Sequence, residues 1–385
     1  MGGAELIGKE EQEAVSEVIG RGVLFRYGFN EKRKNIFTVL DFEAQFCKYM
    51  GCTYALGVSS GSAALRVALA ALGIKHGDEV ITQSFTFVAT IESILEAGGV
   101  PVLTEVDKSL NMDPKDLEGK ITARTRAIIP VHMLGVPARL EEIMAIAHKK
   151  NIPILEDSCQ ACGSSYKGKK TGTLGALGTY SFDYVKTLTT GEGGMVSTND
   201  KKLYDLSCDY HDHGHAHNPE VPRGEDSHKI TGFNYRMNEI QGAIGQVQLS
   251  RLDFVLGEHR RHKGEIKKAI GKISGIEFRD LPDPKGDGAD TLAFFLPDTK
   301  AAKAFNDLLA KAKIDTKILP SAMNWHFAGN WAHMMQYLPP HRADAWPKSE
   351  ALLKRAIALP ISVRMSEEQK ARVIEAVNRA AKEVL

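Results

Sequence analysis

The sequence predicts an α/β protein with two domains: a large one built on a mostly parallel mixed sheet flanked by helices, and a smaller C-terminal α/β domain. The 385 residues, of which 43% are hydrophobic and 25% charged, suffice for two globular domains. Between residues 40 and 200, short apolar runs rich in β-branched residues alternate with helical patterns. Such alternation is typical of strand–helix–strand units whose strands are buried on both faces.

The elements of the large domain follow in order. Residues 9–19 repeat apolar side chains at helical spacing and end at a Gly-Arg-Gly terminator, which predicts a first helix. Predicted strands cover residues 55–58, 79–82, 100–106, 126–131, 152–155 and 179–182. Predicted helices between them cover residues 63–72, 90–97 and 140–148. Residues 208–232 are polar and contain two prolines, so they predict a long loop.

A helix over residues 238–256 is expected to link the large domain, residues 1–256, to the small domain, residues 257–385. In the small domain, residues 275–279 and 291–296 have strand patterns, and residues 300–313 and 367–384 have helical ones. Ser366 and Gln369 have the spacing of a capping box at the start of the last helix.

Composition excludes several classes of protein. With 49 basic and 48 acidic residues the formal net charge is +1, so no overall field favours nucleic acid or an anionic membrane. The apolar runs are far shorter than the roughly 20 residues that span a bilayer, and no secretory signal is visible. Five cysteines are too few for a disulfide scaffold, and Cys159 and Cys162 lack a second pair for a zinc site. We expect a cytoplasmic protein that works without a metal.

Three segments have the residue types of a catalytic site. Ser59-Ser60-Gly61-Ser62 joins a strand to a helix, where free backbone N–H groups and hydroxyls can hold a phosphate. Asp157 follows an apolar strand and is expected at the carboxyl edge of the sheet, where open α/β folds bind ligands. Lys186 lies between a β-like run and a glycine-rich turn, where desolvation would free its amine for attack on a carbonyl. Each segment alone has an ordinary structural explanation: a helix cap, a surface acid or a surface lysine.

Together the three segments fit pyridoxal phosphate, which needs a phosphate cradle, a carboxylate at its ring nitrogen, an aromatic neighbour and a covalent lysine. The sequence here resembles the sugar aminotransferases of the DegT/StrS family, of fold type I. The resemblance extends over essentially the whole chain. The motifs that carry it are S-S-G-S-A-A-L at residues 59–65, E-D-S-C-Q at 156–160, S-F-D-Y-V-K-T-L-T-T-G-E-G-G at 181–194 and N-Y-R-M at 234–237.

The resemblance implies a role for each matched residue. Lys186 is the lysine that binds the cofactor covalently and carries the proton, and Asp157 is the partner of the ring nitrogen. Gln160 lies near the ring hydroxyl, and Phe87 stacks on the ring. Gly61, Ser62 and Ser181 contact the phosphate, while Asn234 reaches the phosphate of the other subunit, which implies a homodimer with shared active sites. Position 186 is histidine in the sugar dehydratases of this family, so its lysine here favours an aminotransferase.

The implied reaction moves the amino group of glutamate to a keto-sugar. Residues 211–226 and 324–326 resemble the branch that aminates 8-oxo-Kdo to 8-amino-Kdo, a free-acid sugar of lipopolysaccharide. A nucleotide-linked 3- or 4-keto-6-deoxysugar is the alternative acceptor. Arginines and protonatable histidines suit a carboxylate. The candidate contacts with substrate are therefore Arg26, His215, Arg223, Arg236 and His326, with the rest of the run His211–His217. This run has an alternative interpretation as a solvated loop.

Overall fold

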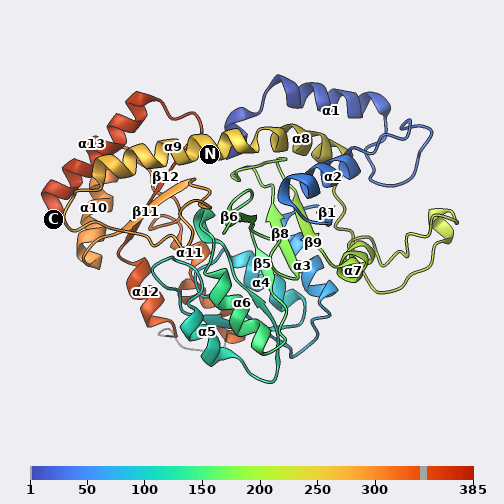
Figure 1. The fold of residues 1–385 in the computed structure, drawn as a ribbon, viewed down its shortest axis with the longest axis horizontal. Helices are drawn as coiled ribbons and strands as arrows, with labels where there is room; N and C mark the ends of the chain where they lie inside the picture. Colours follow the sequence, from blue (N-terminus) through green and yellow to red (C-terminus); the bar gives the residue numbers. More distant parts are fainter. Residues whose placement is uncertain (1, 339–344) are drawn as a thin grey trace.

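The computed structural model describes residues 2–338 and 345–385, and its centre is a mixed sheet (Figure 1). One ladder has the strand order β1-β9-β8-β5 and a second has the order β3-β2-β4. The strands are β1 (Tyr54–Val58), β2 (Glu79–Gln83), β3 (Val100–Thr104), β4 (Thr125–Ile129), β5 (Leu155–Asp157), β8 (Leu177–Ser181) and β9 (Gly194–Thr198). Parallel bridges from Ile128 to Ile154 and from Val131 to Asp157 join the two ladders. Within them, β9 alone is antiparallel to its neighbours.

Both faces of this sheet are covered by helices, as the apolar strands require. Consecutive residues of β2 separate the two sides: Val80 packs in a core with α3 (Gly61–Ala71), and Ile81 packs with α6 (Leu140–Lys149) in another. The other helices of this part are α2 (Thr38–Met50), α4 (Val88–Glu96), α5 (Pro114–Lys120) and α7 (Lys201–His211). The predicted fold class is thus observed, although α2, α5, α7 and β9 were not predicted.

Two predicted boundaries were wrong. Residues 208–211 were predicted as loop but form the last turn of α7, because Asp200 caps that helix and its buried face continues to Tyr210 and His211. The linking helix predicted over residues 238–256 is two helices, α8 (Glu239–Ser250) and α9 (Leu252–Ile270), with a break at Arg251. The first helix, α1 (Lys9–Arg21), ends as predicted at a glycine, Gly22, whose φ is 69°.

The C-terminal part contains a second, antiparallel sheet of β10 (Glu277–Phe278), β11 (Thr291–Phe295) and β12 (Ala356–Pro360). Its helices are α10 (Thr299–Lys311), α11 (Met323–His326), α12 (Pro347–Leu353) and α13 (Glu367–Val384). The predicted capping box between Ser366 and Gln369 is present at the start of α13. Because α9 runs without interruption past residue 256, the division into domains at that residue stays a prediction.

Two features of the outline matter for the site (Figure 1). The long helix α9 connects the two sheets, and the chain after α7 extends away from the body of the molecule before it returns to α8. Among the described helices, none is long and apolar enough to cross a membrane.

Candidate active site

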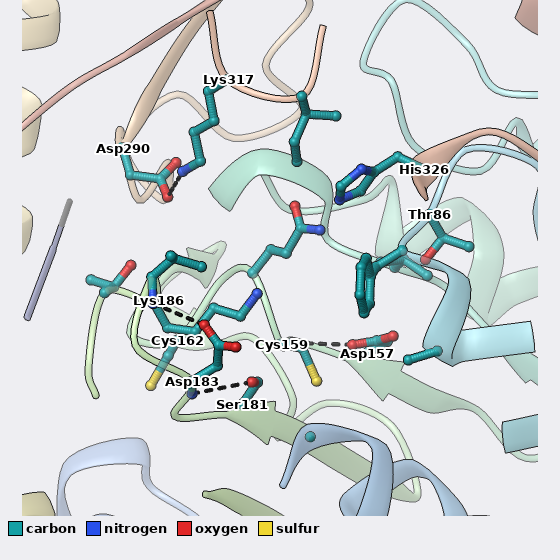
Figure 2. Close-up of a pocket in the computed structure, with 18 of the residues that line it drawn as sticks. Thr86, Asp157, Cys159, Cys162, Ser181, Asp183, Lys186, Asp290, Lys317 and His326 are labelled. Atoms are coloured by element: carbon teal, nitrogen blue, oxygen red, sulfur yellow. Dashed lines mark hydrogen bonds and ion pairs between the residues drawn. The ribbon is translucent and has the colours of Figure 1, made fainter. Parts of the chain in front are cut away.

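A cavity of about 780 Å³ lies where strands of the large sheet end, and residues from both ends of the chain complete its wall. Eight of the predicted site residues line this cavity: Gly61, Ser62, Phe87, Asp157, Gln160, Ser181, Lys186 and His326. Figure 2 shows Asp157 and Cys159 on one side of the cavity and the pair Asp290 and Lys317 on the other, with Lys186 between them.

Asp157 and its neighbour Glu156 have different partners, because successive side chains of a strand point to opposite faces. Glu156 is fully buried, and its carboxylate accepts hydrogen bonds from the backbone N–H groups of Gly172, Leu174 and Gly175 at 2.6–2.8 Å. It also lies 3.0 Å from Nε2 of His132. Glu156 therefore anchors a turn of the fold, and of these two neighbours it is Asp157 that lines the cavity.

The carboxylate of Asp157 is held by hydrogen bonds to each of its oxygens. Thr90 Oγ1 donates to Oδ2 at 2.8 Å, and the backbone N–H of Cys159 donates to Oδ1 at 3.1 Å. Thr86 Oγ1 lies 2.8 Å from Thr90 Oγ1, so the two hydroxyls form a chain that ends at the carboxylate. Each carboxylate oxygen can accept a further bond. Asp157 is thus an oriented acceptor for a cationic N–H in the cavity.

The cysteines beside Asp157 do not form a reactive pair. Cys159 and Cys162 are both free thiols. Burial, with the nearby charge of Asp157, raises the pKa of the Cys159 thiol, and burial raises the pKa of Cys162 to about 12. Protonated thiols are poor nucleophiles and poor metal ligands. Among the described residues, no group of three or more histidine, cysteine or acidic side chains could hold a metal ion.

The turn from β1 into α3 has the geometry of an anion cradle. Ser60 caps the helix, since its Oγ accepts from the backbone N–H of Ala63 at 3.0 Å. A Cβ at Gly61 would lie 2.7 Å from Cβ of Ser181, so this position needs glycine for Ser181 to come so close. The first N–H groups of a helix have no partner within the helix, and its dipole favours a negative charge there. Gly61, Ser62 and Ser181 therefore fit the predicted phosphate site.

Lys186 follows β8 on a turn whose shape is fixed by its own backbone. The backbone N–H of Lys186 donates to the carbonyl of Asp183 at 3.0 Å, and that of Val185 donates to Asp183 Oδ1 at 2.8 Å. The other side of the turn contacts the 3₁₀ helix Gly2–Leu6, where the N–H of Gly3 donates to the carbonyl of Lys186 at 3.2 Å. The backbone of the lysine is thus fixed, while its side chain enters the cavity.

Another part of the cavity wall has an aromatic pair, Phe87 and His326, and the amide of Gln160. Phe87 is 41% exposed, and its ring centroid lies 5.3 Å from that of His326. Gln160 Oε1 accepts from the backbone N–H of Leu134 at 3.0 Å, which leaves its NH₂ group to donate to a ligand. Burial lowers the pKa of His326 to about 4, an effect to which Lys186 and Lys317 contribute. His326 is therefore neutral at pH 7.

Sequence reasoning missed two charged side chains on the wall of the cavity that faces Asp157. Lys317 Nζ lies 2.5 Å from Asp290 Oδ2, and both residues line the cavity. The two residues are 27 positions apart in the sequence, so no single local motif contains both of them. Thr90 was also missed, although its position one helical turn after Thr86 was a usable signal.

The other predicted residues, Arg223 and the histidine run among them, lie outside this cavity. Arg26 is 3% exposed and forms a buried ion pair with Glu43 at 2.7 Å, which gives it a structural role in this chain. Arg236 contacts Asp212 at 2.5 Å, and His215 Nδ1 lies 3.3 Å from Asp226. Asn234 is exposed. Contact of these residues with a substrate or with a second subunit stays a prediction.

The histidine run lies in the polar cluster around Asp212 and Asp226, which also contains Arg236. Nε2 of His211 lies 2.9 Å from the hydroxyl of Tyr27, and Nε2 of His217 lies 3.7 Å from Asp212. The buried carboxylate of Asp212 also pairs with Arg223.

Pyridoxal phosphate fits the cavity. The cavity has the N-terminus of α3 for a phosphate, together with the hydroxyls of Ser62 and Ser181. It also has the buried carboxylate of Asp157, with free lone pairs, and Lys186 directed between the two. Phe87 offers an exposed ring inside the cavity, and Gln160 offers amide donors.

Comparisons with known proteins agree with this geometry. The chain matches the DegT/DnrJ/EryC1/StrS aminotransferase family over residues 5–378. It is 35% identical to the dTDP-3-amino-3,6-dideoxy-alpha-D-galactopyranose transaminase of Aneurinibacillus thermoaerophilus, in an alignment that covers 96% of this chain and 95% of that protein. It is 41% identical to GDP-perosamine synthase of Escherichia coli O157:H7 over 60% of this chain and 63% of that relative, so less than two thirds of the relative's length is matched.

A solved structure of an aminotransferase from Psychrobacter cryohalolentis superposes with a TM-score of 0.85 at 26% identity, and 98% of each chain is covered. This match confirms the predicted fold class. The family match confirms the predicted aminotransferase family. The chain belongs to the DegT/DnrJ/EryC1/StrS aminotransferase family.

Proposed function

We propose that this protein transfers the amino group of glutamate to the carbonyl carbon of a keto-sugar. The observation that carries the proposal is the convergence of Lys186, the carboxylate of Asp157 and the phosphate cradle at α3 in one cavity. When bound, pyridoxal phosphate supplies a carbonyl for the amino group and a ring that delocalises negative charge.

The residues of the chain then have separate tasks. Lys186 would hold the cofactor covalently, and its amine would accept and return the proton at the reacting carbon. Asp157, fixed by Thr90 and by the N–H of Cys159, keeps a proton on the ring nitrogen. Phe87 would stack on the ring and exclude water, and the N-terminus of α3 would hold the phosphate.

The acceptor belongs to one of two chemical classes. A nucleotide-linked 3- or 4-keto-6-deoxysugar is favoured by the names of the relatives, which include a dTDP-sugar transaminase and GDP-perosamine synthases. The free acid 8-oxo-Kdo is the second candidate, and it rests on the resemblance of residues 211–226 and 324–326 described above. Of those residues, His326 lines the cavity.

The test of the acceptor is a direct competition. The purified protein, loaded with pyridoxal phosphate, receives glutamate with 8-oxo-Kdo in one reaction and with dTDP- or GDP-linked ketosugars in others, and mass spectrometry detects the aminated product. We expect product from a nucleotide sugar. Product from the free acid alone would select the second candidate, and no product from any keto-sugar would contradict the proposed function.

We also propose a homodimer in which each subunit completes the other's site. The support is that Asn234, matched to a phosphate contact, is exposed and lies outside the cavity of its own chain. Lys186→Ala and Asn234→Ala chains, each inactive when alone, should recover activity when mixed, because one of the two sites in a mixed dimer is then intact. Failure to recover activity in dimers shown to be mixed would contradict shared sites.

A further inference from the structure

Acidic side chains outnumber basic ones on the wall of the cavity. Six acidic side chains line it: Glu5, Asp157, Asp183, Glu192, Asp290 and Asp315. Among the described lining residues, the full positive charges are those of Lys186 and Lys317, because His326 is neutral at pH 7. When the amine of Lys186 binds the cofactor covalently, it no longer serves as a free ammonium. Lys317 is then the cation that this chain offers to a substrate.

An amino-acid donor brings carboxylates into this acidic space. A carboxylate that loses water without a cation or hydrogen-bond donors in exchange is strongly disfavoured. The proposed donor, glutamate, has two carboxylates, and one of them must lie near the reacting carbon. A positively charged group on the cavity wall is therefore required for the donor to bind.

Lys317 is held in place by its backbone and by its side chain. Its backbone N–H donates to the carbonyl of Ala358 at 2.7 Å, which ties its segment to β12. Its ammonium contacts Asp290, whose other oxygen accepts from Thr291 Oγ1 at 2.8 Å. Burial alone would raise the pKa of Asp290, but the charge and the hydrogen bond of Lys317 contribute most to lowering it to about 2, so this carboxylate is ionised at neutral pH.

The ammonium group of Lys317 also has N–H donors left for a ligand. It has three N–H donors, and Asp290 is the acceptor that the described residues provide for it. Its side chain is 27% exposed, which leaves part of it open to the cavity. Lys317 and Lys186 both line the cavity, so the two side chains face the same space (Figure 2).

We infer that Lys317 is the carboxylate-binding residue for the amino-acid donor, with Asp290 as the residue that positions it. This inference rests on the proposed aminotransferase function. In this arrangement Asp290 directs the ammonium, and a carboxylate of the donor accepts its remaining N–H groups. A lysine that served only to neutralise Asp290 would have no effect on the affinity for carboxylates.

The experiment separates carboxylate binding from amine chemistry. Glutarate has two carboxylates and no amine, and isothermal titration calorimetry measures its affinity for the holoenzyme. Methoxyamine has an amine and no carboxylate, and its reaction with the bound cofactor is followed by visible absorption. Removal of one charge-assisted bond predicts about 10- to 100-fold weaker glutarate binding in Lys317→Gln, with methoxyamine unchanged. Lys317→Arg should restore most of the affinity.

A second variant covers the case in which Lys317→Gln fails to fold because Asp290 is left unpaired. Asp290→Asn combined with Lys317→Gln removes both charges, keeps the shapes, and should show the same loss of glutarate affinity. Lys311→Gln, on the exposed side of α10, is the control for a lost charge elsewhere. Equal glutarate affinity in the parent and in the double variant would overturn the inference. A parent that shows no cofactor band and no methoxyamine reaction would instead overturn the proposed function.

Discussion

The two walls of the cavity are assembled in different ways. The cofactor wall comes from three strand ends of one sheet, where Gly61, Asp157 and Ser181 each lie within a few residues of β1, β5 or β8. The opposite wall comes from separate segments: the 3₁₀ helix Gly2–Leu6, the start of β11, and the chain around Lys317. A wall built on strand ends has fixed geometry, whereas one built from connecting segments can change with the substrate.

This difference predicts where a substitution stops the chemistry and where it changes selectivity. Lys186→Ala should have the largest effect, because it removes the covalent attachment and the proton carrier together. We expect loss of the visible band of the bound cofactor and a fall in turnover by several orders of magnitude. Lys169→Ala, at an exposed position of the strand β7 (Lys169–Lys170), is the control. Transamination near the parent rate by Lys186→Ala would refute its assignment.

The next effect compares two adjacent carboxylates. Asp157→Asn keeps the shape but removes the charge that holds a proton on the ring nitrogen, so transamination should slow about 100-fold or more. Glu156→Gln should instead lower the free energy of unfolding, since Glu156 holds the turn at residues 172–175. Stopped-flow absorption measures the first and urea unfolding the second. A parent-like rate for Asp157→Asn would show that another group faces the ring nitrogen.

The same contrast explains what could be predicted from the sequence. Asp157, Lys186 and Gly61 lie in continuous motifs at strand ends, so a short window of sequence contains both the chemistry and its placement. The pair of Asp290 and Lys317 depends on how β11 and β12 pack, which no short window contains. Arg26 shows another limit of sequence reasoning: its residue type suits a substrate carboxylate, and in the fold its partner is the buried carboxylate of Glu43. Residue type alone cannot distinguish a substrate contact from a core ion pair.

A buried histidine on the long helix α9 predicts how the stability of the protein depends on pH. His259 on α9 is fully buried near Asp290 and Lys317, and burial lowers its pKa to about 4. Because its pKa is lower in the folded than in the unfolded protein, unfolding takes up a proton below pH 6.5. Stability due to this residue is complete above about pH 6.5 and falls as the pH drops toward 4.

When the pH falls from 7 to 5, protonation of this histidine in the unfolded chain should lower the free energy of unfolding by about 2 kcal/mol. Urea unfolding of the parent and of His259→Leu at several pH values measures the difference in slope. His148→Leu, which replaces an exposed histidine of α6, is the matched control and should retain the parent's slope. An identical pH dependence in His259→Leu and the parent would contradict the assignment of the neutral state to His259.

The smallest effect tests how rigid the cofactor wall must be. Thr90→Val keeps the volume of the side chain but removes the hydroxyl that donates to Asp157 at 2.8 Å. The carboxylate then loses one of its two fixing bonds, and a loss of this size corresponds to about 10-fold slower transamination, with the cofactor still bound. Thr82→Val is the matched control, since Thr82 Oγ1 donates to the carbonyl of Ile129 within the same sheet at 2.8 Å and not to Asp157. If both variants slow the reaction equally, the sheet as a whole sets the rate; if only Thr90→Val does, the chain from Thr86 through Thr90 to Asp157 tunes the ring nitrogen.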